Sequence, residues 1–248
     1  MHLFAVFDGH GGADAALFAE EALHRELLVG LAQEQQCDAG AGVDRATAAG
    51  IAERALARAF GAIDAAILAA GITGGTTAVA LLLLGELAVV ANAGDCRAVL
   101  CRGFAAGSKE GGSALELSSD HVASDAAERA RVEATGGSVV RTADGRLRVG
   151  GVCEVTRALG DAALKRHGVI ATPDVTATAL DARDAFIILA CDGVWDVMTS
   201  QRACAYVSDT VRHVDFGAKR VVMEAFNNDS DDNLSAIVVY LFADACPS

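Results

Sequence analysis

Hydrophobic positions along the chain follow two patterns, one typical of helices and one typical of strands. Residues 13–36 and 44–70 place apolar side chains three or four positions apart, which predicts two long amphipathic helices. Residues 4–7, 76–84 and 185–191 are nearly continuous apolar runs. Runs of this length predict strands that are buried on both faces of a sheet.

The links between strands predict how the strands pair. Residues 76–84, 87–93 and 96–102 read as three strands, joined by Gly85-Glu86 and by Gly94-Asp95. Links of two residues that contain glycine are typical of antiparallel hairpins, so we expect these three strands to form a meander.

The rest of the chain mixes both patterns. The further predicted elements are a strand at 115–117, a helix at 124–135, a hairpin at 138–149, helices at about 200–213 and 216–226, and a last strand at 234–242. Antiparallel sheets that are covered on both faces pack against each other with helices outside. The pattern therefore predicts an α+β fold, a four-layer α-β-β-α sandwich of two antiparallel sheets flanked by helices.

Composition narrows the domain organisation and the function classes. With 2 prolines and no linker-like stretch, the 248 residues are expected to form a single domain, 1–248. The formal net charge of −13 argues against nucleic acid and against an anionic membrane surface as partners. The apolar runs are too short to cross a bilayer, so we expect no membrane span, and the first residues predict a core strand and not a signal peptide. The 7 cysteines, without a C-x-x-C pair, are typical of reduced thiols, so we expect an intracellular protein, in the cytoplasm or the nucleus.

Acidic residues stand at the ends of three predicted strands. Asp8 follows the first apolar run, Asp192 follows the run at 185–191, and Asp232 precedes the last strand. Hard divalent cations such as Mg²⁺ take oxygen ligands of this kind, so one interpretation is a shared metal site at one end of the sheets. Asp-Gly pairs at strand ends are also typical of plain turns, and from the residues alone that interpretation stays open.

Several other kinds of site are missing from the sequence. It contains neither a G-x-x-x-x-G-K-[ST] phosphate loop nor a G-x-S-x-G nucleophile motif. Gly9-His-Gly11 begins like a dinucleotide loop, but Asp14 stands where the third glycine belongs.

The predicted hairpin at 138–149 is the most basic part of an acidic chain, with Arg141, Arg146 and Arg148.

The segment Val6-Phe-Asp-Gly-His-Gly-Gly12 resembles the signature of the metal-dependent protein Ser/Thr phosphatases, the protein phosphatase 2C family. The resemblance continues in order along nearly the whole chain. Its further motifs are Gly75-Thr-Thr77, Ala91-Asn-Ala-Gly-Asp-Cys-Arg97, Asp120-His121, Gly136-Gly137, the segment 156–161, Ala190-Cys-Asp-Gly-Val-Trp-Asp196 and Asp232-Asn-Leu-Ser235. So many motifs in one order identify the chain as a member of this family.

The resemblance implies a reaction and a set of site residues. The expected reaction is hydrolysis of phosphoserine and phosphothreonine in proteins by a water that two Mg²⁺ or Mn²⁺ ions activate, with His10 as general acid. Asp8 is expected to bridge the two metals, and Gly9 to bind one of them through its carbonyl oxygen. The other implied metal ligands are Asp192 and Asp232, with Asp120 and Asp196 completing a weaker third site beside Asp192.

The resemblance also implies what this sequence lacks. Family members carry strands before the Asp-Gly-His motif, with a Glu-Asp pair and a phosphate-binding Arg, whereas this chain begins inside the strand of that motif. We therefore expect a domain that is N-terminally truncated relative to the family, with reduced activity and an unpaired sheet edge. Glu154 is a smaller departure, at a position that is usually small or apolar in the family.

Two functions follow as expectations. The first is a phosphatase that acts on phosphorylated protein substrates as a monomer. The alternative is a catalytically impaired pseudophosphatase that acts as a regulatory or binding module.

Overall fold

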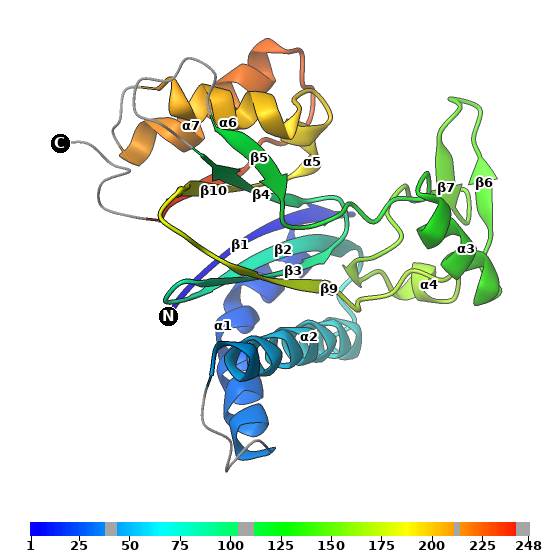
Figure 1. The fold of residues 1–248 in the computed structure, drawn as a ribbon. Coiled ribbons are helices and arrows are strands. Elements are labelled where there is room, and N and C mark those ends of the chain that lie inside the picture. The colour runs from blue at the N-terminus through cyan, green and yellow to red at the C-terminus, as the bar shows by residue number, and fades with distance from the viewer. Residues whose placement is uncertain (38–43, 104–111, 211–213, 242–248) are drawn as a thin grey trace.

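The computed structural model describes residues 1–37, 44–103, 112–210 and 214–241, which form a four-layer α-β-β-α sandwich (Figure 1). Two sheets lie face to face in the middle. One outer face is covered by α1 (Asp14–Cys37) and α2 (Arg45–Ala69), and the other by α6 (Ser200–Ser208) and α7 (Val214–Asn227). The four-layer fold predicted from the sequence is confirmed.

All strand pairs in the two sheets are antiparallel. The larger sheet has the order β1-β2-β3-β9, with β8 paired to β2, and the smaller has the order β11-β10-β4-β5. The larger sheet consists of β1 (His2–His10), β2 (Gly75–Leu84), β3 (Leu87–Ala93), β8 (Leu159–Gly160) and β9 (Asp174–Ala179). The smaller sheet consists of β4 (Arg97–Arg102), β5 (Ser113–Glu116), β10 (Asp184–Ala190) and β11 (Ala236–Tyr240).

Apolar side chains fill all three spaces between the layers. Phe60 and Ile63 of α2 pack on the larger sheet, and Leu81 meets Ile187 between the two sheets. Phe186 packs under α6 and α7. Because β2, β3 and β10 have apolar neighbours on both faces, almost every residue in these strands is buried, as their continuous apolar runs predicted.

The link at Gly94-Asp95 does not form the hairpin that the sequence predicted. β3 lies in the larger sheet and β4 in the smaller, so the predicted meander was wrong for its third strand, although β2 and β3 do pair. Gly94 has a φ of +120°, and a Cβ at this position would overlap the side chain of Thr77. Only glycine fits this conformation and this space, and it lets the chain cross from one sheet to the other.

Other elements also differ from the sequence prediction. β9 was missed because its sequence, with alternating Thr and Ala, contains no apolar run, yet it forms the edge beside β3. The helix predicted to extend to about residue 213 ends at Ser208. Residue 242, the predicted end of the last strand, lies outside the described residues.

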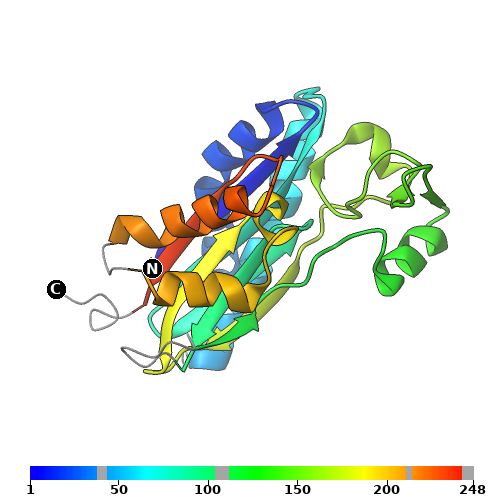
Figure 2. The same ribbon diagram turned by 90° about the horizontal axis from the view of Figure 1, so that it is seen from above.

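A smaller unit projects beside one end of the sandwich, as both views show (Figures 1 and 2). This side unit contains α3 (Ala126–Ala134), β6 (Val139–Arg141), β7 (Leu147–Val149) and α4 (Ala162–Lys165). β6 and β7 form the predicted hairpin, with Gly145 in its turn at a φ of +84°. Val132, Val149 and Val169 belong to a small core of their own in this unit.

None of the helices in the described ranges is both long enough and apolar enough to cross a bilayer.

Candidate active site

Three acids from different strand ends meet in one cavity. Asp8 lies near the end of β1, Asp192 begins α5 (Asp192–Trp195) directly after β10, and Asp232 precedes β11. These three residues, the strand-end acids, line a cavity of about 1260 Å³. They converge because β10 pairs with β11 and the two sheets stack with these ends together, as their positions in the sequence predicted.

The strand-end acids repel each other. Burial and a hydrogen bond with Asp192 raise the pKa of Asp8 to about 7, and the charges of Asp192 and Asp232 add to this shift. A carboxylate oxygen from each of Asp8 and Asp192 and the Sγ atom of Cys191 lie within 4.8 Å of one another. Oδ1 of Asp192 is buried and has no hydrogen-bond partner in the part of the chain that the structure describes.

These observations fit a divalent cation at the strand-end acids. A cation would offset the mutual repulsion, and Oδ1 of Asp192, which lacks a partner among the described residues, could bind it as a ligand. The oxygen donors suit Mg²⁺ or Mn²⁺. Cys191 is not needed as a ligand, because its Sγ atom donates to the carbonyl oxygen of Asn233 at 3.2 Å and accepts from the amide of Ser235 at 3.3 Å.

Gly9 lies between Asp8 and His10 and lines the same cavity. A Cβ at position 9 would lie 3.1 Å from the Ala16 Cβ and 3.1 Å from the Gly12 carbonyl oxygen. The close approach of β1 to the start of α1 therefore leaves little room for a side chain at this position.

His10 also lines the cavity and is paired with an acid, Asp161, that the sequence did not predict as a site residue. Its Nε2 atom lies 2.6 Å from Oδ2 of Asp161. This hydrogen bond raises the pKa of His10, although burial acts in the opposite direction. Asp161 is almost fully buried and has a φ of +53°, and its amide donates to the Gly74 carbonyl oxygen at 2.8 Å. The His10 ring is thereby held by a fixed carboxylate.

Asp120 and Asp196, the acids predicted for a third metal, line the cavity in different surroundings. Both oxygens of Asp120 accept hydrogen bonds from Arg97, at 3.0 and 2.5 Å. Burial raises the pKa of Asp196, the charge of Asp192 adds to the shift, and the charge of Arg146 opposes it.

Asp95, which the sequence predicted to lie in a hairpin turn, is a further acid on the cavity. Burial raises its pKa well above the ordinary value, and the charges of Asp192 and Asp120 add to the shift. Asp95 reaches this place because the chain crosses between the sheets at Gly94.

Comparison with known families matches residues 1–234 to the model described as "Protein phosphatase 2C". The chain belongs to the protein phosphatase 2C family. It is 37% identical over 246 residues to "Probable protein phosphatase 2C 59" of Arabidopsis thaliana, a match that covers 98% of this chain and 70% of that protein. It is 40% identical over 247 residues to "Probable protein phosphatase 2C 47" of Oryza sativa subsp. japonica, covering 95% of this chain and 59% of that protein. The chain thus spans less than two thirds of the rice relative.

Solved structures agree with the fold of a protein phosphatase 2C. The structure of serine-threonine phosphatase 2C from Toxoplasma gondii matches with a TM-score of 0.81 at 22% identity, covering 96% of this chain and 84% of that one. A structure titled "Structure of a C.elegans sex determining protein" matches with a TM-score of 0.76 at 26% identity, covering 97% of this chain and 56% of that one.

All the site residues expected from the resemblance to the protein phosphatase 2C family line the one cavity. They are Asp8, Gly9, His10, Asp120, Asp192, Asp196 and Asp232. The structure adds Asp95 and Asp161, the first as one more acid in the cavity and the second as the partner of His10.

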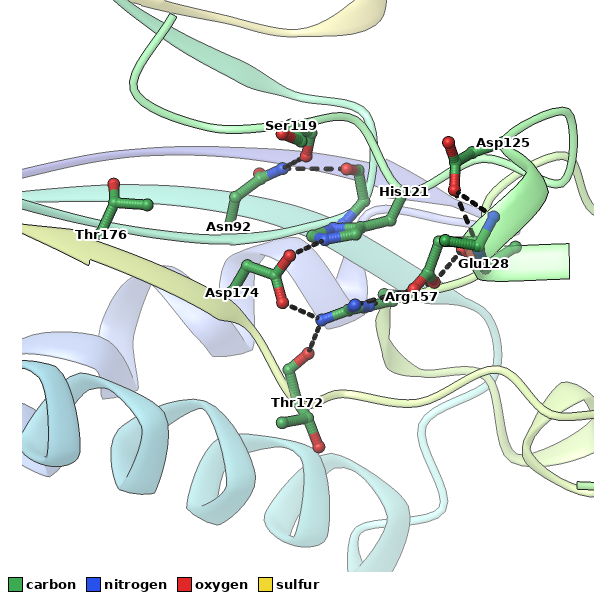
Figure 3. A network of polar contacts seen from close by, with 12 residues as sticks. Asn92, Ser119, His121, Asp125, Glu128, Arg157, Thr172, Asp174 and Thr176 are labelled. Atoms are coloured by element: carbon green, nitrogen blue, oxygen red, sulfur yellow. Dashed lines mark hydrogen bonds and ion pairs between the residues drawn. The ribbon is translucent and has the colours of Figure 1, made fainter. Parts of the chain in front are cut away.

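A partly buried ion-pair network connects the side unit to the sandwich of this protein phosphatase 2C domain (Figure 3). Arg157 donates to the carboxylate of Glu128 on α3 at 2.7 and 3.1 Å, and to Asp174 on β9 at 2.6 Å. Arg131 and Thr156 also donate to Glu128, at 2.9 and 2.6 Å. These contacts hold Thr156 and Arg157, and so they fix the beginning of the segment that ends at Asp161, the partner of His10.

The same network reaches the crossing between the sheets through His121 (Figure 3). His121 Nε2 lies 3.1 Å from Oδ2 of Asp174, and its Nδ1 accepts from the amide of Gly94 at 3.3 Å. Burial lowers the pKa of His121, although Asp174 acts in the opposite direction. One neutral, buried ring thus connects the ion pairs to the backbone that carries Asp95.

We expect Glu128→Gln to lower the free energy of unfolding at pH 7 by about 3 kcal/mol, because it removes a buried countercharge and leaves the partly buried Arg157 and Arg131 without it. Urea denaturation measures this change. The matched control is Glu86→Gln, which removes an exposed carboxylate paired with Arg45 and should change the free energy of unfolding by less than about 0.5 kcal/mol.

The effect of Glu128→Gln should depend on pH. Burial raises the pKa of Glu128, but the hydrogen bonds from Arg157, Arg131 and Thr156 outweigh this and hold the pKa well below its ordinary value. A carboxyl with a lowered folded-state pKa stabilises the fold fully above its unfolded-state pKa of about 4.3, and this contribution is lost as the pH falls. The difference between wild type and variant should therefore narrow below about pH 4.5. A constant difference from pH 7 to pH 3 would contradict this assignment.

Proposed function

We propose that the chain is a metal-dependent protein serine/threonine phosphatase that uses Mg²⁺ or Mn²⁺. The observation that carries the proposal is the cavity where the strand-end acids lie beside the His10–Asp161 pair, with one buried Asp192 oxygen that has no hydrogen-bond partner among the described residues. Membership of the protein phosphatase 2C family supports the same reaction.

The residues of the cavity have three roles in the proposed reaction: metal binding, proton donation and orientation of the proton donor. Two cations held by the strand-end acids and the Gly9 carbonyl, with a weaker third beside Asp192 and Asp196, would activate a water and offset the charge of a phosphate monoester. His10 donates its proton to the serine or threonine oxygen as the bond from that oxygen to phosphorus breaks. Asp161 orients the His10 ring and favours its protonated form.

The geometry of the site does not support the alternative function, a catalytically impaired binding module. Acids held this close together, two of them half-buried, repel each other and destabilise the fold in the absence of a cation. A surface used only for binding has no need of such a cluster, whereas metal-dependent hydrolysis does. We further propose a monomeric, intracellular protein that acts on phosphorylated proteins.

The test is phosphate release from p-nitrophenyl phosphate and from a phosphothreonine peptide, with MnCl₂, with MgCl₂ and with EDTA. We expect hydrolysis that requires one of the two ions and that Asp8→Ala removes. Hydrolysis that persists in EDTA, or no hydrolysis with either ion, would overturn the proposal. Size-exclusion chromatography with light scattering tests the monomer.

A further inference from the structure

One wall of the cavity is basic, although the chain as a whole carries a net charge of −13. Arg141 on β6, Arg146 in the turn and Arg148 on β7 line the same cavity as the strand-end acids. We call these three residues the arginine wall. Cations at the strand-end acids would hold the phosphate in the proposed reaction, which leaves the arginine wall to face other parts of a substrate.

Two residues of the arginine wall, Arg146 and Arg148, are paired with the carboxylate of Glu154. Its carboxylate accepts hydrogen bonds from Arg146 at 3.0 and 3.2 Å and from Arg148 at 2.9 Å. Arg148 is also paired with Asp144, at 2.8 Å. The side chains of Arg146 and Glu154 are 60% and 38% exposed, so water reaches their ion pair. An exposed ion pair contributes little to stability, so a carboxylate from another molecule can replace Glu154 at small cost.

We propose that the arginine wall is a subsite for acidic residues next to the phosphorylated residue of a substrate protein, and that Glu154 occupies this subsite when no substrate is bound. The inference rests on the proposed phosphatase function and names a preferred class of substrate for it. A cavity of about 1260 Å³ has room for residues on either side of a phosphothreonine. Guanidinium groups bind carboxylates through paired hydrogen bonds, which favours Asp and Glu at the flanking positions.

The experiment uses phosphothreonine peptides that differ only in three consecutive flanking residues. These are all Asp, all Gln or all Lys, and they stand either directly before or directly after the phosphothreonine. Hydrolysis with Mn²⁺ gives kcat/KM for each peptide. A second arm measures binding of fluorescent peptides that carry a non-hydrolysable phosphonate, by anisotropy in EDTA, so that it needs no catalysis. We expect the acidic flank on one side to give about fivefold higher kcat/KM and affinity than the neutral flank, with a smaller preference at high salt.

Two variants test the residues. Arg146→Gln, which changes an exposed side chain, should reduce the preference for the acidic flank to about twofold or less. Glu154→Gln should strengthen binding of the acidic peptide by about threefold, because it removes the competing carboxylate. The matched control is Arg183→Gln, an exposed arginine that pairs with Asp181 and does not line the cavity. It should keep the wild-type preference.

The outcomes separate this inference from the proposed function. Equal binding and equal hydrolysis of acidic and neutral peptides by the wild type would overturn the inference, as would an Arg146→Gln variant that keeps the full preference. If neither the peptides nor p-nitrophenyl phosphate are hydrolysed with Mn²⁺, the phosphatase function fails. The binding arm then still decides whether the arginine wall selects acidic flanks.

Discussion

Replacing Asp192 with asparagine should abolish most Mn²⁺ binding and, with it, phosphatase activity. Asp192 contributes the buried oxygen that has no hydrogen-bond partner among the described residues, and it lies beside Asp8, so it is central to the proposed metal site. Loss of a metal that supplies several kcal/mol to the transition state should lower kcat/KM by about 10²-fold or more. Calorimetric titration with Mn²⁺ and phosphate release from p-nitrophenyl phosphate measure the two effects.

Thermal unfolding of the same Asp192→Asn variant gives a reading that is independent of catalysis. A ligand at a hundredfold excess over its dissociation constant stabilises the folded state by about 2.7 kcal/mol, or about 5–10 °C for a domain of this size. The wild type should show this rise in Tm with Mn²⁺ and lose it in EDTA, whereas the variant should not respond.

The sign of the effect in EDTA separates a metal ligand from a structural acid. Asp192 raises the pKa of Asp8 through a hydrogen bond and through its charge, so removing that charge relieves repulsion. In EDTA the variant should unfold at the same temperature as the wild type or higher. A lower Tm in EDTA would mean that Asp192 stabilises the fold without metal. Asp181→Asn, which removes an exposed acid outside the cavity, is the matched control and should keep the Mn²⁺ response.

The strand-end acids could be predicted from the sequence because their signal is local. A continuous apolar run marks a strand, and an acid directly after the run must lie near the rim of the sheet, although β1 itself continues to His10. Asp8 and Asp192 therefore needed no knowledge of topology beyond two sheets stacked with the same ends together. The four-layer arrangement was predictable for the same reason, since strands that are apolar on both faces require cover on both faces.

The partner of His10 could not be predicted, because no local pattern marks it. Asp161 lies 151 positions further along the chain, in a segment without hydrophobic periodicity, and it adopts a left-handed backbone conformation. Asp95 was missed because a two-residue link with glycine suits both a hairpin and a crossing between sheets. The space beside Thr77 decides between them, and that space exists only in the folded protein.

The place of the arginine wall in the cavity could not be predicted from the sequence either. The basic character of the hairpin at 138–149 was visible in the sequence, but the direction it faces depends on how the side unit attaches to the sandwich. That attachment runs through Glu128, Arg157 and Asp174, which come from distant parts of the chain. The role of Glu154 follows only from the fold, which places it beside Arg146.

Asp161→Asn should lower kcat for a phosphoserine peptide by about 10²-fold, because His10 loses the carboxylate that orients it and favours its protonated form. Asparagine is the substitution of choice, since it keeps nearly the same shape and tolerates the φ of +53° at this position. Circular dichroism and Mn²⁺ titration should match the wild type, which shows that the fold and the strand-end acids are intact.

The leaving group decides whether Asp161 acts through proton donation. A serine oxygen leaves as a strongly basic alkoxide unless His10 protonates it, whereas p-nitrophenolate is a weak base and leaves without a proton. The loss of kcat should therefore be about 10²-fold with the phosphoserine peptide and less than about tenfold with p-nitrophenyl phosphate. Equal losses with both substrates would mean that Asp161 supports the cavity in general and not the proton donor.

Gly75→Ala offers a second route to the same pair without removing the carboxylate. A Cβ at position 75 would overlap the carboxylate group of Asp161, so the side chain must turn away from His10. The variant should lose kcat in the same direction as Asp161→Asn and with the same dependence on the leaving group. In the double variant the two losses should not add, because both act on one hydrogen bond. Additive losses would place the effect of Gly75→Ala elsewhere in the cavity.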